Sequence, residues 1–116
     1  MDINHDGFTQ KYTKVICEDT WKFNAPHQFY VAETKRNNII EKVHFQEGPI
    51  KEYGINGVSN EDLLLMIVTR LEAFQKSEYK CEENQRAIDY LMKAVEALRD
   101  RTNKRIANGT EGTSAI

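Results

Sequence analysis

The hydrophobic pattern divides the chain into two parts. Up to about Gly57, β-branched and aromatic residues gather in short segments, and apolar positions alternate around Ile40, Val43 and Phe45. The segments that predict strands are 12–17, 27–32 and 38–46. Because the intervening stretches are too short for parallel crossovers, we expect an antiparallel sheet of three strands, or four. The turn-forming stretch 48–57 predicts a loop or an irregular edge strand.

From Ser59 onward the period is helical. We expect a first helix over about 60–75, with Ser59 as an N-cap that accepts the amide hydrogen bond of Asp62. The apolar residues of this helix surround almost its whole circumference, so both sides should be covered, one by the sheet and the other by a second helix or another subunit. These residues are Leu63, Leu64, Leu65, Met66, Ile67, Val68, Leu71 and Phe74.

The last helix, predicted over about 82–107, has the clearest pattern. Its apolar residues repeat at spacings of 3, 4 and 3, as in a coiled-coil seam: Ile88, Leu91, Val95 and Leu98. A helix of this length extends about 39 Å, more than a three-stranded sheet can cover. We therefore expect a partner, most simply a second copy that crosses antiparallel about a two-fold axis near Ala94. The helix should stop at Asn108-Gly109, and 111–113 indicate a frayed polar tail.

Together these elements predict an α+β fold with an N-terminal antiparallel sheet followed by two C-terminal helices. A chain of 116 residues with a formal net charge of −2 is most simply a single domain, 1–116. Within it, 1–58 form the sheet region and loop, 59–108 the two-helix region and 109–116 the tail. The longest wholly apolar run has six residues, which excludes a transmembrane protein. We expect no secretory signal and a reducing compartment.

Catalytic and metal chemistry has little support in the sequence. Cys17 and Cys81 match no metal or redox spacing, and we expect free, buried thiols. His5, His27 and His44 are scattered, and each is expected to be a surface or sheet histidine. The near-neutral charge argues against binding of DNA or RNA polymers, which usually require a basic face.

The polar ends of the helical seam indicate a nucleotide pocket. In an antiparallel pair, Asn84 of one copy would face Arg101 and Arg105 of the other. Two arginines spaced i and i+4 can hold a pyrophosphate through charge-assisted contacts, and Phe74 or Tyr79 supplies a flat face for a purine. No phosphate-binding glycine loop is present, and nothing in the set activates a water molecule.

The same residues have a purely structural explanation. A phenylalanine at a helix end is usually core, arginines near a helix C-terminus complement the dipole, and a seam asparagine often fixes register. The pattern alone leaves both explanations open.

Several segments resemble the first Thoeris anti-defence family of small bacteriophage and prophage proteins. The resemblance covers about residues 44–113, and its motifs are FQEGPIKE (45–52), NGVSNEDLL (56–64), RLEAFQ (70–75), CEEN (81–84) and RTNKRIANGTEGT (101–113). It implies a protein that sequesters, without cleavage, the cyclic ADP-ribose isomers made by a bacterial TIR-domain enzyme, so that the downstream effector is not switched on. It also implies a sheet and two helices that assemble into dimers and hexamers.

The resemblance assigns ligand-binding roles to individual positions. Adenine stacking falls on Phe74, with Asn84 as its partner, and phosphate binding falls on Arg101 and Arg105. A further family arginine after the sheet has only Lys51 near its position. We add two neighbouring residues to this expected set, Tyr79 in the interhelix turn and Thr113 beside the arginines.

We therefore expect a non-enzymatic sponge in the cytoplasm of the infected host, active as a homodimer or hexamer. Its ligand would be an isomer such as glycocyclic ADP-ribose, with no cofactor, metal, membrane or nucleic-acid polymer involved. One alternative is a phage interaction protein whose helical face docks a host protein. Another is a sponge for the cyclic oligonucleotides of the CBASS pathway. A hydrolase would need a general base, for which the pocket offers only Glu111.

Overall fold

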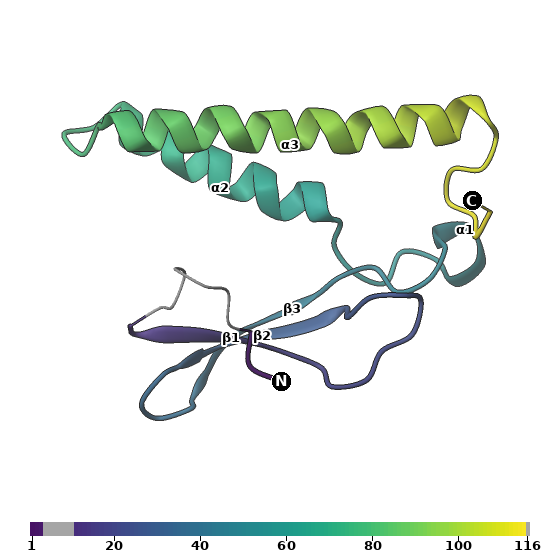
Figure 1. The fold of residues 1–116 in the computed structure, drawn as a ribbon, viewed down its shortest axis with the longest axis horizontal. Coiled ribbons are helices and arrows are strands. Elements are labelled where there is room, and N and C mark those ends of the chain that lie inside the picture. Colours follow the sequence, from purple (N-terminus) through teal and green to yellow (C-terminus); the bar gives the residue numbers. More distant parts are fainter. Residues whose placement is uncertain (4–10, 116) are drawn as a thin grey trace. The chain divides into compact units, whose positions relative to one another are not determined.

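The structure is a computed structural model that describes residues 1–3 and 11–115. Figure 1 shows the element order, which is β1 (Thr13–Cys17), β2 (Gln28–Glu33), β3 (Ile39–His44), α1 (Ile50–Tyr53), α2 (Asn60–Gln75) and α3 (Glu82–Ala107). This order confirms the predicted α+β fold, with a sheet first and a long helix last. The chain forms two compact units, Met1–Val58 and Ser59–Ile116. Each unit is described by itself below, and the expectation of a single domain stays a prediction. His5 lies outside the described residues.

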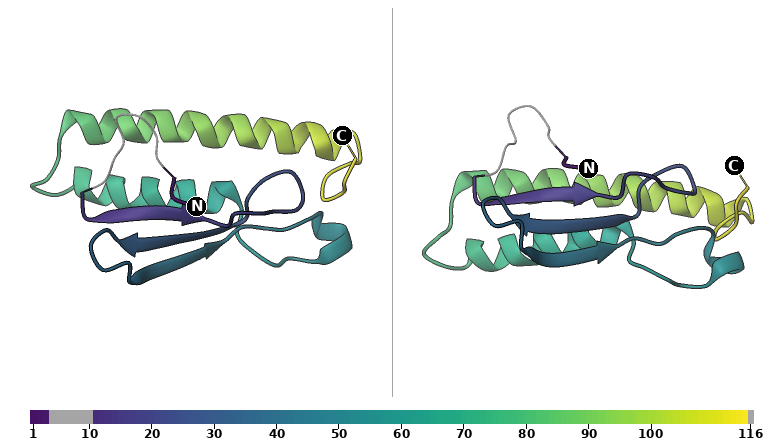
Figure 2. Two further views of the ribbon diagram at one scale, coloured as in Figure 1. Left: turned by 60° about the horizontal axis from the view of Figure 1, so that its bottom comes forward. Right: turned by 90° about the horizontal axis from the view of Figure 1, so that it is seen from below.

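The first unit contains a three-stranded antiparallel sheet in the order β1-β2-β3, as predicted (Figure 2). Val15 lies opposite Val31, and Phe29 lies opposite Val43. Residues 1–3 continue the sheet beyond β1, since the Cys17 amide donates to the carbonyl of Met1 at 2.9 Å. Among the described residues, the optional fourth strand is reduced to two isolated bridges, one between Asp2 and Ile16 and one between Phe45 and Val58.

The buried positions of this unit are small or polar. Cys17 at the end of β1 and Ala32 in β2 are buried, as is His27 just before β2. The His27 ring nitrogen Nε2 lies 2.7 Å from the carbonyl oxygen of Lys22, which explains how an imidazole is tolerated there. His27 is therefore not a surface histidine, but its carbonyl accepts from the Phe45 amide at 2.8 Å and so continues the pairing of β2 with β3.

The stretch 48–57 is a loop that includes the single helical turn α1. Its two ends are tied together by side chains. The Gln46 Nε2 amide donates to the carbonyl of Gly54 at 2.8 Å, and the Asn56 amide N–H donates to Gln46 Oε1 at 2.9 Å. Gly48 has φ 78°, and a Cβ there would lie 2.6 Å from Cδ2 of Tyr53. These contacts close the stretch as a loop instead of an edge strand.

The second unit is a helical hairpin. α2 begins with a capping box: Ser59 Oγ accepts from the Asp62 amide at 3.1 Å, and Asp62 Oδ2 accepts from the Ser59 amide at 2.9 Å. This confirms the predicted N-cap. A second reciprocal pair closes the turn, because the Gln75 side chain both donates to the Cys81 carbonyl and accepts from the Cys81 amide, each at 3.0 Å.

The two helices pack side by side and antiparallel, so the predicted seam is largely filled within one chain (Figures 1 and 2). Ile88 and Val95 are buried, and Val95 is only 2% exposed. On α2, Val68 is buried, but Met66 remains 59% exposed. α3 thus covers one side of α2, and the expectation that the other side is covered as well stays a prediction.

α3 ends where the sequence predicts. Gly109 adopts φ 71°, its amide donates to the carbonyl of Ile106, and the Thr110 amide donates to the carbonyl of Arg105. This is the Schellman arrangement for which glycine is favoured. The expectation of a frayed tail is wrong, because residues 110–115 fold back onto Arg105.

Candidate functional site

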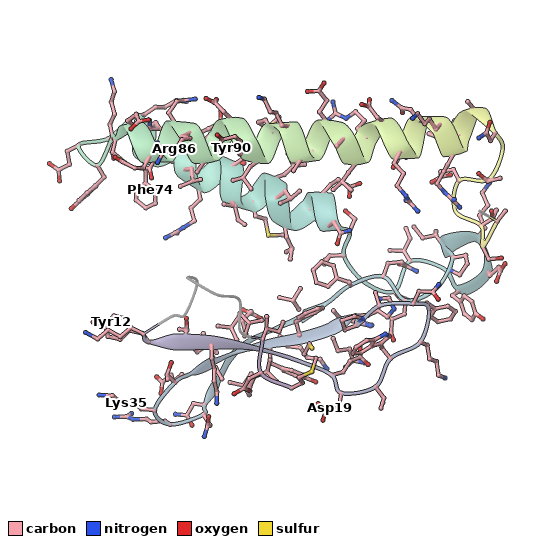
Figure 3. All side chains as sticks on the ribbon, viewed as in Figure 1. Tyr12, Asp19, Lys35, Phe74, Arg86 and Tyr90 are labelled. Carbon is pink, nitrogen blue, oxygen red and sulfur yellow. The ribbon has the colours of Figure 1, made fainter. Side chains whose placement is uncertain are left out.

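Three predicted ligand residues meet at the turn of the helical hairpin. Phe74 lies in the last turn of α2, Tyr79 in the connection and Asn84 in the first turn of α3. The Phe74 and Tyr79 rings lie edge to face, with centroids 6.4 Å apart and planes at 85°. Asn84 Nδ2 donates to the carbonyl of Tyr79 at 3.4 Å. Phe74, labelled in Figure 3, is half-buried. Tyr79 is 67% exposed, so the cluster presents aromatic surface to solvent.

A fourth residue of this cluster, Arg70, was not predicted. Its guanidinium carbon lies 5.3 Å from the centroid of the Phe74 ring, the geometry of a cation–π contact. Arg70 and Phe74 are four positions apart on one helix, a spacing that places their side chains on the same face. This spacing of four residues in the sequence could have predicted that Arg70 belongs to the cluster.

Ser77 orders the turn that carries these groups. Its hydroxyl donates to the carbonyl of Phe74 at 2.7 Å and accepts from the Tyr79 amide at 3.1 Å. The aromatic pair is therefore held on a defined backbone.

The predicted phosphate-binding arginines lie at the other end of α3. Arg101 and Arg105 are 17 and 21 positions beyond Asn84. At 1.5 Å per residue these separations are about 26 and 32 Å along the helix axis. The structure therefore brings Phe74, Tyr79 and Asn84 together but does not bring the arginines to them.

Arg105 is surrounded by the C-terminal segment. Its Nη1 donates to the carbonyl of Ala115, and its Nη2 donates to the carbonyls of Thr110 and Thr113, each at 2.9 Å. The Thr113 hydroxyl in turn donates to the carbonyl of Thr110 at 2.6 Å. Arg105 and Thr113 are thus neighbours, as predicted from sequence, whereas Arg101 is exposed one turn earlier on the helix.

Lys51 belongs to a different unit from the other predicted residues. It is exposed on α1 in the first unit, whereas the other six belong to the second unit. Its contribution to the ligand site stays a prediction.

The first unit has a hollow of about 450 Å³ lined by Glu18, Thr20, Trp21, Lys22 and Glu47. Both carboxylates in it are already engaged. Glu18 Oε2 accepts from the amides of His27 and Gln28, each at 2.8 Å, and these hydrogen bonds lower the pKa of Glu18 below its usual value. Glu47 Oε2 lies 2.6 Å from Nε2 of His44. These groups order the loops around the hollow, and none of them was in the predicted site.

Other candidate chemistry is limited. Within residues 1–3 and 11–115, no three His, Cys, Asp or Glu side chains cluster as a metal site would require. Cys17 and Cys81 are both free, but Cys81 is exposed, which corrects the expectation of two buried thiols. It caps α3, where the turn leaves its side chain outside the hairpin core. Across the described part of the chain, no helix has the length and apolar character needed to cross a bilayer.

The structure defines a small α+β protein with an aromatic and amide cluster at one end of a long helix and an arginine pair at the other. No protein-family model matches the chain. It is 36% identical to a protein of Bacillus phage SBSphiJ7 described as Thoeris anti-defense 1, over an alignment of 137 residues that covers 97% of this chain and 96% of the relative. The chain therefore belongs to the Thoeris anti-defense 1 family.

Proposed function

We propose that this phage protein counters Thoeris defence by binding and sequestering a cyclic ADP-ribose isomer, such as glycocyclic ADP-ribose, without cleaving it. The observation that carries the proposal is the similarity, over nearly the whole chain, to a protein described as Thoeris anti-defense 1. Removal of the signal in the host cytoplasm would leave the effector inactive. The proposal involves no cofactor and no catalytic residue.

The geometry supports specific roles. The Phe74 ring, fixed by the ordered turn and partly open to solvent, is suited to stack on adenine, and the Asn84 amide is suited to hydrogen-bond a base edge. Arg101 and Arg105 are suited to the pyrophosphate, because a guanidinium makes bidentate, charge-assisted contacts to phosphate oxygens.

A complete pocket requires two copies, because its parts lie at opposite ends of α3. An antiparallel pair about a two-fold axis near Ala94 would place position 84 of one copy opposite position 104 of the other, between the two arginines. Ile88 and Val95 are already buried, so the second copy would use a neighbouring stripe of the same helix. This stripe repeats at spacings of 3, 4, 3 and 4 and consists of Ala87, Tyr90, Ala94, Ala97 and Arg101. Tyr90, labelled in Figure 3, is 64% exposed there. We propose this dimer, with a hexamer as its higher assembly.

Isothermal titration of the purified protein with cyclic ADP-ribose isomers tests the proposal. We expect tight binding of one isomer, followed by recovery of the unchanged molecule when the complex is heated and the supernatant is chromatographed. Recovery of a cleaved product would make the protein an enzyme, and no heat with any isomer would exclude this ligand class.

A pair of variants locates the phosphate site. Arg101→Ala removes charge-assisted hydrogen bonds of about 1.5–3 kcal/mol and should weaken binding by about tenfold to a hundredfold or more. Arg99→Ala removes the same charge two positions earlier, on another side of α3, and should bind as the parent protein does. If Arg101→Ala binds the ligand as tightly as Arg99→Ala does, Arg101 is not part of the phosphate site.

The exposed apolar residues of α2 favour a second candidate function, docking of a host protein. Leu65, Met66 and Ile67 all remain more than two-fifths exposed. A docking protein would retain a specific polypeptide in a pull-down from infected cells and would release no nucleotide on heating. Titration with CBASS cyclic oligonucleotides, under the same conditions, tests the third candidate ligand class.

A further inference from the structure

A single side chain ties the end of α2 to the start of α3. Gln75, the last residue of α2, makes two hydrogen bonds to the backbone of Cys81, six positions later. Its Nε2 donates to the Cys81 carbonyl and its Oε1 accepts from the Cys81 amide, each at 3.0 Å. A primary amide offers a donor and an acceptor side by side, so it can pair with both backbone groups of one residue. Together the two bonds form a clamp across the turn, the Gln75 clamp.

The backbone bonds of the same turn are more local. Three of its amides donate to carbonyls only three positions earlier, those of Lys76, Ser77 and Lys80. The Ser77 hydroxyl reaches no further than Phe74 and Tyr79. These bonds order the backbone around the two aromatic rings without joining one helix to the other. The Gln75 clamp does join them, because Cys81 is the N-cap of α3.

The start of α3 has weaker local support than the start of α2. α2 begins with the reciprocal capping box of Ser59 and Asp62. Within the described part of the chain, the Cys81 side chain makes no capping hydrogen bond to α3. The Cys81 carbonyl accepts the first bond of the helix, from the Gln85 amide, at 3.4 Å. The position of this helix start relative to α2 therefore depends on the Gln75 clamp.

We propose that Gln75 is a positioning residue for base recognition, whose clamp holds Asn84 where it and Phe74 can contact the same purine. The inference rests on the proposed function, in which Phe74 stacks on adenine and Asn84 hydrogen-bonds the base edge. These two groups come from different helices, so the turn between the helices sets their separation. Asn84 lies three residues beyond Cys81, in the first turn of α3, and moves with the clamped helix start. Gln75 acts through Asn84 and not on the ligand.

A matched pair of variants tests the clamp in the full-length protein. Gln75→Met removes both hydrogen bonds and keeps an unbranched side chain that favours a helix. Gln85→Met makes the same change beside Asn84, where the lost bond goes to Asp89 of the same helix. In isothermal titration with the cyclic ADP-ribose isomers, glycocyclic ADP-ribose first, we expect the Kd of Gln75→Met to rise by about threefold to tenfold, because fewer molecules are competent to bind. Gln85→Met should match the parent.

A double variant separates positioning from a general loss of stability. If the clamp acts through Asn84, addition of Gln75→Met to Asn84→Ala should lower the thermal midpoint further but should not raise the Kd further. Full additivity of the two changes in binding would contradict the positioning role. Gln75→Glu is a milder variant for use if Gln75→Met does not fold. It keeps the acceptor for the Cys81 amide and loses the donor, so its Kd should lie between those of the parent and Gln75→Met.

Amide hydrogen exchange reports the clamp in the free protein. The Cys81 amide donates to Gln75 Oε1, so its protection should fall in Gln75→Met and persist in Gln85→Met. The Asp62 amide, bonded within the capping box of α2, should keep its protection in both variants and serves as the internal control. Equal protection of the Cys81 amide in the parent and in Gln75→Met would overturn the clamp.

The binding results distinguish failure of this inference from failure of the proposed function. A parent-like Kd in the Gln75 variants, with tight binding by the parent protein, would overturn the positioning role and leave the function intact. Absence of binding by the parent protein with every isomer would overturn the proposed function and the positioning role with it.

Discussion

The two ends of α3 differ in how ready they are to bind. At the start of the helix, Phe74, Tyr79 and Asn84 are held in an ordered turn, and aromatic surface is open to solvent. At its end, the Arg105 guanidinium is enclosed by backbone carbonyls of the same chain. Under the proposed function, the turn that would bind the base is ordered by its own hydrogen bonds, whereas at the proposed phosphate end Arg105 already donates to three carbonyls of its own chain.

The largest effect should come from damage to the hairpin that supports both ends. Ile88→Ala removes a buried side chain between α2 and α3 and should cost about 2–5 kcal/mol of unfolding free energy. Chemical denaturation followed by circular dichroism measures this loss. Ile106→Ala, at a site 58% exposed, is the control and should change stability little. Similar losses of unfolding free energy in both variants would show that Ile88 is not buried between α2 and α3 as described.

Removal of the Phe74 ring should weaken binding of the base at the turn and leave the arginine end of α3 unchanged. Stacking of a base on an aromatic side chain contributes about 1–3 kcal/mol, so Phe74→Ala should weaken nucleotide binding by about fivefold to 150-fold. Phe74→Tyr keeps an aromatic face and should retain most of the affinity. Titration of both variants with the same isomer makes the comparison. If Phe74→Ala binds with the parent Kd, the aromatic cluster is not the base site.

Substitution of Arg70 should have the smallest effect on ligand affinity. It tests whether the cation–π contact that holds the Phe74 ring contributes to stacking of the base. The cation–π contact of Arg70 with Phe74 contributes about 0.5–1 kcal/mol at an exposed site, so Arg70→Ala should weaken binding by about twofold to fivefold. Arg86→Ala, an exposed arginine on α3 that pairs with Glu82, is a charge-matched control without a contact to Phe74 among those described. In a double variant, loss of Arg70 should add nothing once Phe74 is absent. Full additivity would show that Arg70 acts independently of the ring.

The helix boundaries were predictable because their signals are local. The Ser59 and Asp62 capping box and the glycine at 109 mark the ends of α2 and α3 within a few residues of sequence. The antiparallel order of the strands likewise followed from short connections. The aromatic and amide cluster was predictable since Phe74, Tyr79 and Asn84 are close in sequence.

The parts that sequence did not predict depend on contacts between a side chain and distant backbone. A polar segment such as 110–115 has no hydrophobic period. Nothing in its composition shows that its backbone carbonyls will accept hydrogen bonds from the Arg105 guanidinium. The exposure of Cys81 and the burial of His27 likewise depend on how the turns fold around them. The seam at Ile88 and Val95 predicted a buried face correctly, but periodicity does not say whether the covering helix belongs to the same chain.

The contrast between the two cysteines has a practical consequence. Cys17 is buried in the sheet unit, whereas Cys81 is exposed three positions before Asn84. A maleimide fluorophore should therefore attach to the natural sequence at one place, beside the turn. Such a dye would report the binding of a nucleotide at the turn in a stopped-flow experiment without any engineered cysteine.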